Sequence, residues 1–176
     1  MDLLDELAPR FDFALREHIA VEAPGPVVYS ALAGSGTRRC RCGVPTVRPR
    51  RNVPGFDELL TSARWVPLGR RPGEEIVTGA AGRFWTPYMD WCPLTPAEFA
   101  VFDRPCRATI AVSLSVGDCG AGRCVLSFEA RVRATDAVAF RWADWYWHQV
   151  RPSAGVVVRD LLHSVRSVAL ATARQH

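Results

Sequence analysis

A long aromatic segment near the C-terminus constrains the fold of this chain more than any other feature. It begins after Thr135 and Asp136, which favour a helix N-cap, and it carries three tryptophans within six residues, at positions 142, 145 and 147. After Pro152, apolar residues recur at spacings of four, four and three, at positions 157, 161, 165 and 168. The pattern predicts one long helix over residues 136–172, kinked near Pro152. Because each aromatic side chain buries about 150–250 Å², the rest of the chain must supply a surface that covers this helix.

The polar residues in the first half of this helix share one narrow arc of a helical wheel: Arg141, Asp144, His148 and Arg151. Asp144 and His148 lie four residues apart, a spacing at which a carboxylate can orient an imidazole for general-base chemistry. The two arginines on the same arc favour a different interpretation, a solvated helix face with salt bridges. We favour this second interpretation.

Residues 11–22 alternate between apolar and polar side chains, which predicts a long, half-buried β-strand. The apolar side is shared by Phe11, Phe13, Leu15, Ile19 and Val21. Glu17 falls on this side too, against the pattern. Its carboxylate lies either at a β-bulge or at a position where the inner face of the strand meets a wet cavity.

The remaining segments predict short helices and an antiparallel sheet. Two short helices are expected at residues 27–33 and 55–64, and strands at residues 65–68, 74–81, 83–90, 108–116 and 124–132. Residues 117–122 read as a hairpin turn between the last two strands. This order predicts an α+β fold, in which a curved antiparallel sheet wraps around the long C-terminal helix and two short helices follow the first strand. The 176 residues are expected to form a single domain.

All 22 basic residues are arginines, which excludes Schiff-base chemistry and a P-loop lysine. Several of them gather in residues 34–54, a segment broken by glycines and prolines that we expect to be a flexible insertion. The segment has no aromatic residue to stack on a base, so no nucleic-acid partner is expected.

The cysteines raise the question of a metal site. Cys40 and Cys42, together with Cys92 and Cys106, suggest zinc, but the two-residue spacers of structural zinc sites are missing. No nucleotide-binding or hydrolase motif is present either. We therefore expect neither a metal nor a cofactor.

Three stretches carry a resemblance to a known family: the opening strand with residues 23–32, residues 79–85, and residues 131–136 leading into Tyr146, Trp147, Arg151 and Pro152. On these stretches the chain resembles the START-like helix-grip (SRPBCC) superfamily, which includes polyketide cyclases and lipid-transfer domains. The resemblance covers about residues 11–172, and the insertion at 34–54 departs from it. It implies a cavity between the sheet and the long helix that takes an apolar or aromatic small molecule. It implies no shared catalytic residue.

Inside such a cavity, the polar candidates for orienting a ligand are Glu17, Thr78, Tyr88, Tyr146 and Gln149. The apolar wall is expected to include Trp85, Ile110, Val112, Leu126, Phe128, Trp142 and Trp145. The alternative is that the polar groups are hydrogen-bond partners in a filled core. The sequence leaves both possibilities open.

Three functions are compatible with these patterns. The first is binding of a hydrophobic or aromatic small molecule, such as a lipid or a polyketide. The second is a cyclase or dehydratase in which Glu17 or a tyrosine moves protons, and the third is a protein-interaction scaffold with a filled core, including a homodimer through the aromatic helix. The N-terminus lacks the features of a signal peptide, and no apolar run approaches the roughly 20 residues that span a bilayer. We expect a cytoplasmic protein without a membrane span.

Overall fold

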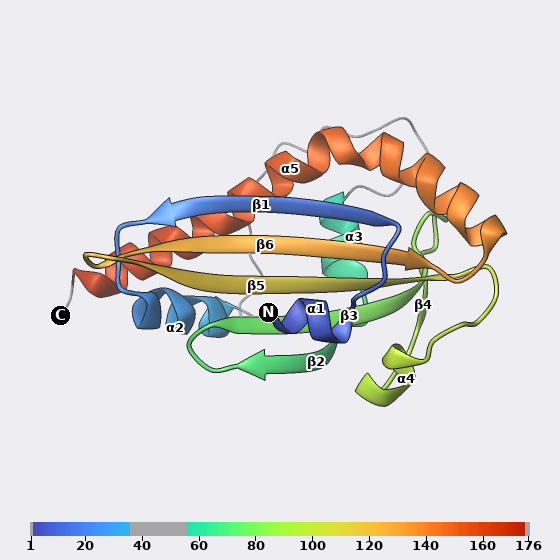
Figure 1. Cartoon of the computed structure of the whole chain (residues 1–176). Coiled ribbons are helices and arrows are strands. Elements are labelled where there is room, and N and C mark those ends of the chain that lie inside the picture. The colour runs from blue at the N-terminus through green and yellow to red at the C-terminus, as the bar shows by residue number, and fades with distance from the viewer. Residues whose placement is uncertain (1, 36–55, 175–176) are drawn as a thin grey trace.

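A computed structural model describes residues 2–35 and 56–174, and it shows one antiparallel sheet with a long helix along one face (Figure 1). In chain order the elements are α1 (Leu3–Leu7), β1 (Phe13–Val21), α2 (Gly25–Ser35), α3 (Phe56–Ser62), β2 (Val66–Arg71), β3 (Glu75–Arg83), β4 (Asp90–Cys92), α4 (Pro96–Ala100), β5 (Ala108–Gly120), β6 (Arg123–Ala134) and α5 (Ala137–Ala173). The strands lie in the order β1-β6-β5-β3-β2, and β4 pairs with β3. The predicted α+β fold, a curved antiparallel sheet with a long C-terminal helix, is confirmed.

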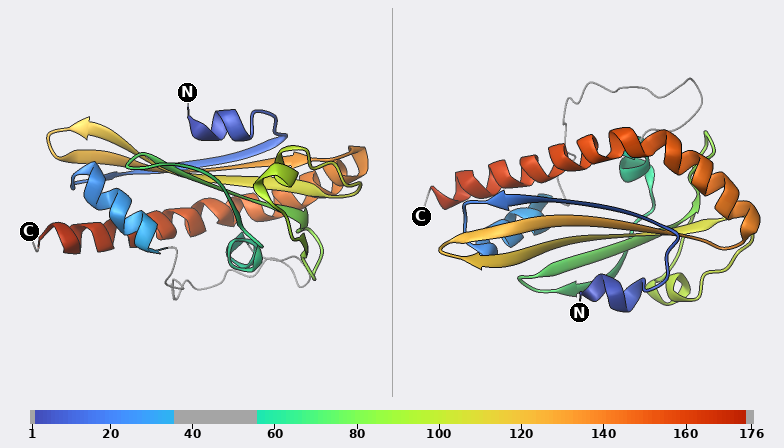
Figure 2. Two further views of the ribbon diagram at one scale, coloured as in Figure 1. Left: turned by 90° about the horizontal axis from the view of Figure 1, so that it is seen from below. Right: turned by 45° about the horizontal axis from the view of Figure 1, so that its top comes forward.

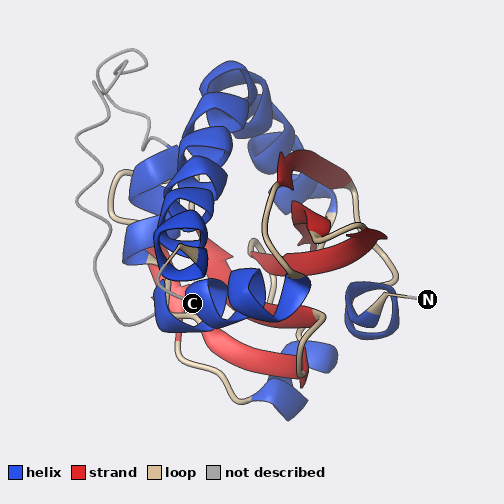
Figure 3. Cartoon of the chain, turned by 90° about the vertical axis from the view of Figure 1, so that its left-hand side faces the viewer, coloured by secondary structure: helices blue, strands red, loops and turns tan. Residues whose placement is uncertain are grey.

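The two faces of the sheet are covered by different helices. Helices α1 and α5 lie on opposite sides of the sheet (Figure 2), and in the end view the strands curve partly around α5 (Figure 3). Alternate residues of β5 and β6 point toward α5, and these residues are apolar. They include Ile110, Leu126 and Phe128. These side chains form the main hydrophobic core together with the buried side of α5.

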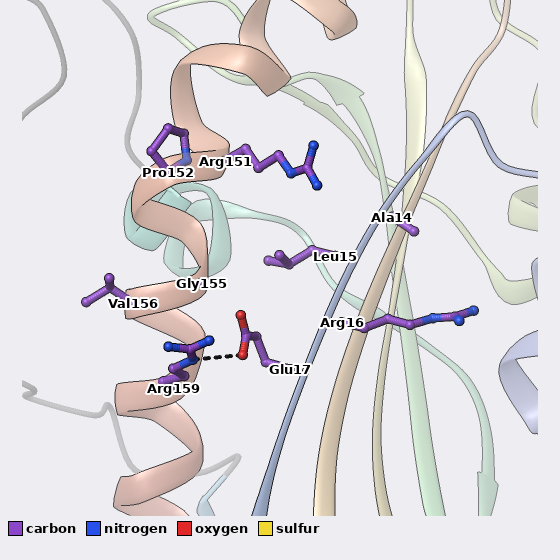
Figure 4. A pocket seen from close by; sticks show the side chains of 9 residues that line it. All are labelled: Ala14, Leu15, Arg16, Glu17, Arg151, Pro152, Gly155, Val156 and Arg159. Atoms are coloured by element: carbon purple, nitrogen blue, oxygen red, sulfur yellow. Dashed lines mark hydrogen bonds and ion pairs between the residues drawn. The ribbon is translucent and has the colours of Figure 1, made fainter.

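Small side chains bring α5 close to the sheet. The buried side of the helix carries Ala139, Ala143, Ala154 and Ala169, each no more than 1% exposed. The larger buried groups, such as Tyr146 and Val150, fill the space between these alanines. The helix changes direction near Pro152, as expected for a residue that has no backbone N–H to donate to the carbonyl four residues earlier (Figure 4).

Asp136 fixes the start of α5. One carboxylate oxygen accepts the backbone N–H of Ala139 at 2.7 Å, and the other accepts the N–H of Cys106 at 2.6 Å. Cys106 has a positive φ of 56°, a conformation that non-glycine residues seldom adopt. These backbone N–H donors, Ala139 first and Cys106 second, hold the pKa of Asp136 below its usual value.

Asp136→Ala is therefore expected to destabilise the protein in a pH-dependent way. A depressed folded-state pKa contributes stability that is present above the unfolded-state value of 3.8 and is lost as pH falls through the folded-state value. In urea denaturation, the gap in unfolding free energy between wild type and Asp136→Ala should be full at pH 5 to 6 and should narrow below pH 3.8. A gap that stays constant over this range would show that the carboxylate charge is not what holds the cap.

A polar cluster fastens α1 to the other face of the sheet. The side chain of Glu75, which is 4% exposed, accepts the N–H of Leu3 at 2.7 Å and the hydroxyl of Ser113 at 2.6 Å. At the opposite end of α1, the Arg131 guanidinium donates to the carbonyl of Ala8 at 3.0 Å and pairs with Asp5 at 2.6 Å. A carboxylate at the N-terminal end and a guanidinium at the C-terminal end both complement the helix dipole.

Three predictions about local structure need correction. The strand expected at residues 83–90 is wrong: β3 ends at Arg83, and a turn follows in which Met89 donates to the carbonyl of Thr86 at 3.0 Å. The turn buries Phe84 and Trp85, whose apolar character was mistaken for strand alternation. Helix α1 was not anticipated, and the hairpin turn is shorter than expected because β5 continues to Gly120. Residues 36–54 of the predicted insertion lie outside the described residues.

Candidate ligand-binding site

Glu17 points from β1 toward α5. Strand β1 pairs with β6 without a register shift from Phe13 to Val21, so the β-bulge considered for Glu17 is wrong. The carboxylate lies on the inner face, its side chain is 16% exposed, and it accepts from Nε of Arg159 at 2.8 Å (Figure 4). Figure 4 shows this ion pair linking the strand to the helix.

A groove of about 370 Å³ surrounds this ion pair. Among the described residues, its lining comes from β1 and the middle of α5: Ala14, Leu15, Arg16, Glu17, Arg151, Pro152, Gly155, Val156 and Arg159. The bend of the helix near Pro152 lies at one end of the groove (Figure 4). The groove therefore lies between the sheet and the C-terminal helix, at the edge strand of the sheet.

Gly155 leaves the space that the Glu17 carboxylate occupies. A Cβ atom at this position would lie 2.9 Å from Oε1 of Glu17, closer than side-chain atoms normally approach. Glycine in the middle of a helix costs about 0.5–1 kcal/mol relative to alanine. The chain thus carries a locally unfavourable residue at a helix position that lies against the carboxylate.

Arg151 brings a second guanidinium to the groove. It lies one helical turn before Gly155 and two turns before Arg159, so the three residues follow one side of α5. Its side chain extends toward β1, and within the described part of the chain it forms no ion pair (Figure 4). Arg16 contacts the other face of the sheet, where it pairs with Glu129 at 2.8 Å. Among the described residues, the groove is therefore bordered by two exposed guanidiniums and one largely buried carboxylate.

Most of the predicted apolar wall belongs to a packed core. Ile110 and Leu126 are 0% exposed, Phe128 and Tyr146 are 1% exposed, and Trp85 and Val112 are 7% exposed. Since an accessible void beside a residue would count as exposed surface, Ile110 and Leu126 border no space large enough for a water molecule. Thr78 is half-buried on β3 opposite Val112. For these buried positions the filled-core alternative describes the structure better than a cavity wall.

Four predicted site residues lie at the surface instead, and their expected cavity position is wrong. Tyr88 is 94% exposed, Trp142 is 54% exposed and Trp145 is 45% exposed; Gln149 is exposed as well. Trp142 and Trp145 were expected to face the sheet. In the structure, the side of α5 that carries the alanines packs on the sheet instead. Of the three tryptophans in α5, Trp147 is the buried one, with 7% of its surface exposed. Trp142 and Trp145 contact each other edge to face, with ring centroids 6.3 Å apart.

Arg151, Gly155 and Arg159 were missed by sequence reasoning. A signal for them was present, because an inward carboxylate on a strand needs a cationic partner from the element that packs on it. The two arginines of α5 that lie eight residues apart, with a glycine midway, could have been predicted as such partners. The pairing with Glu17 was hidden because the two partners are separated by 142 positions in the chain.

Other candidate chemistry is not assembled in the described residues. His148 Nδ1 lies 3.5 Å from Asp144 Oδ1, and both side chains are well exposed, at 71% and 43%, which fits the solvated helix face. Cys92 is buried and Cys106 is half-buried, and no group of three or more metal-binding side chains gathers in residues 2–35 and 56–174. Cys40 and Cys42 lie outside the described residues. Among the described helices, none has the length and apolar character to cross a membrane.

Comparisons with known proteins add little. No protein-family model matches the sequence, and no curated protein matches it. Among solved structures, one match is the di-domain ARO/CYC StfQ from the steffimycin biosynthetic pathway, with 15% sequence identity over 80% of this chain. The match spans 44% of the length of that protein, and its TM-score is 0.22. A match this weak decides neither the fold nor the function of this chain.

Proposed function

We propose that the protein binds a small organic molecule in the groove between β1 and α5. The observation that carries this proposal is the position of Glu17, a charged side chain on the inner face of a strand. The Glu17 side chain is 16% exposed and its partner Arg159 is 63% exposed, so the cost of leaving water falls mainly on the carboxylate. Gly155 makes room for this carboxylate between the strand and the helix. Both features favour a role in recognition over a role in stability.

The lining indicates an amphipathic ligand. Leu15 supplies apolar surface at the base of the groove, while Glu17, Arg151 and Arg159 supply charge. Pockets that bind small molecules combine apolar walls with a few polar groups that fix the orientation of the ligand. The expected ligand therefore has an apolar or aromatic body with a polar end, which is narrower than the hydrophobic molecule predicted from the sequence.

Binding is favoured over a cyclase-type activity. The carboxylate proposed to move protons, Glu17, is engaged by Arg159 at 2.8 Å. The two tyrosines considered for the same role lie away from the groove, since Tyr146 is buried in the core and Tyr88 is 94% exposed. The described lining thus offers groups suited to holding an ion or a dipole.

A protein contact through α5 is the second candidate. Val138, Trp142 and Trp145 are 41%, 54% and 45% exposed, and their spacings of four and three place them on one side of the helix. Tryptophan is enriched at the energetically dominant positions of protein interfaces. This surface supports a homodimer or a heterologous contact as an alternative function.

The groove can be tested by filling it. In the double variant Glu17→Ala/Gly155→Leu, removal of the carboxylate makes room for the new leucine side chain, while Glu17→Ala alone leaves the space open. Native mass spectrometry of freshly purified protein should show a co-purified adduct on wild type that the double variant lacks and the single variant keeps at least in part. If wild type carries no adduct, amphipathic ligands should raise its unfolding free energy by about 2.7 kcal/mol at a hundredfold excess over the dissociation constant. Equal binding by wild type and the double variant would contradict the proposal.

A further inference from the structure

We infer that the ligand of this groove carries an acidic group and that Arg151 binds it. This inference rests on the proposed function, and it names the chemical class of the ligand. Its basis is an imbalance of charge along one side of α5, where two exposed guanidiniums border the groove and, among the described residues, only Arg159 has a counter-ion.

The Glu17–Arg159 pair neutralises itself. Nε of Arg159 donates to Oε2 of Glu17 at 2.8 Å, and the glutamate side chain is only 16% exposed. A ligand acid gains less from Arg159, because the positive charge of this guanidinium is already balanced by the Glu17 carboxylate. The anion is therefore expected at the other end of the groove.

Arg151 is the guanidinium of this groove that has no ion-pair partner among the described residues. Its side chain reaches from α5 toward β1 above Leu15 (Figure 4). The carboxylate on its own helix arc, Asp144, lies next to His148 instead, with 3.5 Å between Nδ1 and Oδ1. No described residue supplies an ion-pair partner for Arg151. A planar guanidinium with several free N–H donors is suited to a carboxylate, which it can bind with two parallel hydrogen bonds.

The spacing along the helix leaves room for the body of such a ligand. Arg151 and Arg159 are eight residues apart, or about 12 Å along the helix axis at 1.5 Å per residue. Gly155 lies midway and adds no side chain to the space between them. An acid held by Arg151 would thus place its apolar part over Leu15, ending near the Glu17–Arg159 pair.

The test uses a matched pair of probes, 2-naphthoate and its uncharged amide, 2-naphthamide. Isothermal titration calorimetry on wild type should show that the acid binds at least about tenfold more tightly than the amide, because a charge-assisted hydrogen bond outweighs a neutral one. Arg151→Gln should remove this preference and leave the affinity for the amide unchanged. Arg141→Gln, an exposed arginine on the same helix outside the groove, should keep the preference.

The possible outcomes separate this inference from the proposed function. If the acid and the amide bind equally, and both lose affinity in Glu17→Ala/Gly155→Leu, the groove binds ligands but the acidic class is wrong. A preference for the acid that survives in Arg151→Gln would overturn the role of Arg151. If neither probe binds wild type, or if binding persists in the filled double variant, the inference fails together with the site on which it rests.

Discussion

Arg131→Met is expected to lower the free energy of unfolding by about 1.5–3 kcal/mol, the usual loss when hydrogen bonds to charged groups are removed. The Arg131 side chain is 5% exposed and pairs with Asp5 and Glu129, both at 2.6 Å. Burial alone would lower the pKa of Arg131, but hydrogen bonds to these two carboxylates outweigh burial and raise it. Methionine has similar length and no charge, so the variant would leave the carbonyl of Ala8 without its donor and Glu129 with Arg16 as its remaining partner.

Arg16→Met is the matched control, because Arg16 pairs with the same Glu129 from the exposed side. The Arg16 side chain is 63% exposed, so its loss should cost about 1 kcal/mol or less. Urea denaturation of both variants, with the slope of the transition compared, measures the difference. Similar small losses in the two variants would mean that the buried cluster does not hold α1 on the sheet.

Phe128→Ala should cost about 3–5 kcal/mol, whereas Trp142→Ala should cost about 1 kcal/mol or less. Phe128 is 1% exposed in the main core, so its truncation leaves a cavity that the packed surroundings fill only in part. Trp142 is 54% exposed, although it carries the larger ring. Thermal or urea denaturation of the two variants measures this difference in stability.

The opposite order of stabilities would contradict the packing described above. A large loss for Trp142→Ala would mean that this tryptophan is buried in solution, as the helical wheel suggested. A small loss for Phe128→Ala would mean that the space between sheet and helix is loosely filled. Either result would favour an internal apolar cavity between the sheet and α5.

Periodicity in the sequence was sufficient to predict the architecture. The alternation in residues 108–116 and 124–132 marked β5 and β6, and the N-cap at Asp136 marked the start of α5. These are local signals, each carried by consecutive residues. The kink near Pro152 followed from proline chemistry for the same reason.

Features that depend on partners distant in the sequence could not be predicted. Helix α1 has five residues, too few to be stable alone, and it is fastened by Glu75 and Arg131, which are 72 and 126 positions from their partners Leu3 and Asp5. The orientation of α5 was misjudged for a related reason. Both an aromatic side and an alanine side were available, and the close approach of the sheet decided between them.

The candidate site was predicted only in part. Glu17 was singled out because it broke the alternation of its strand, and the wet-cavity interpretation agrees with its position in the groove. Its partner Arg159 and the glycine opposite could not be assigned without the docking angle of α5. The predicted aromatic wall was drawn from side chains that proved to be core or surface.

The most direct test of the central claim is to locate a bound probe in solution. Nuclear Overhauser effects can be measured between the ring protons of 2-naphthoate and methyl groups of the protein labelled with ¹³C. The ligand-binding account predicts contacts to the methyl groups of Leu15, which point into the groove from β1 (Figure 4). Contacts confined to Val138 and to the indole protons of Trp142 and Trp145 would place the probe on the exposed side of α5 and contradict the claim.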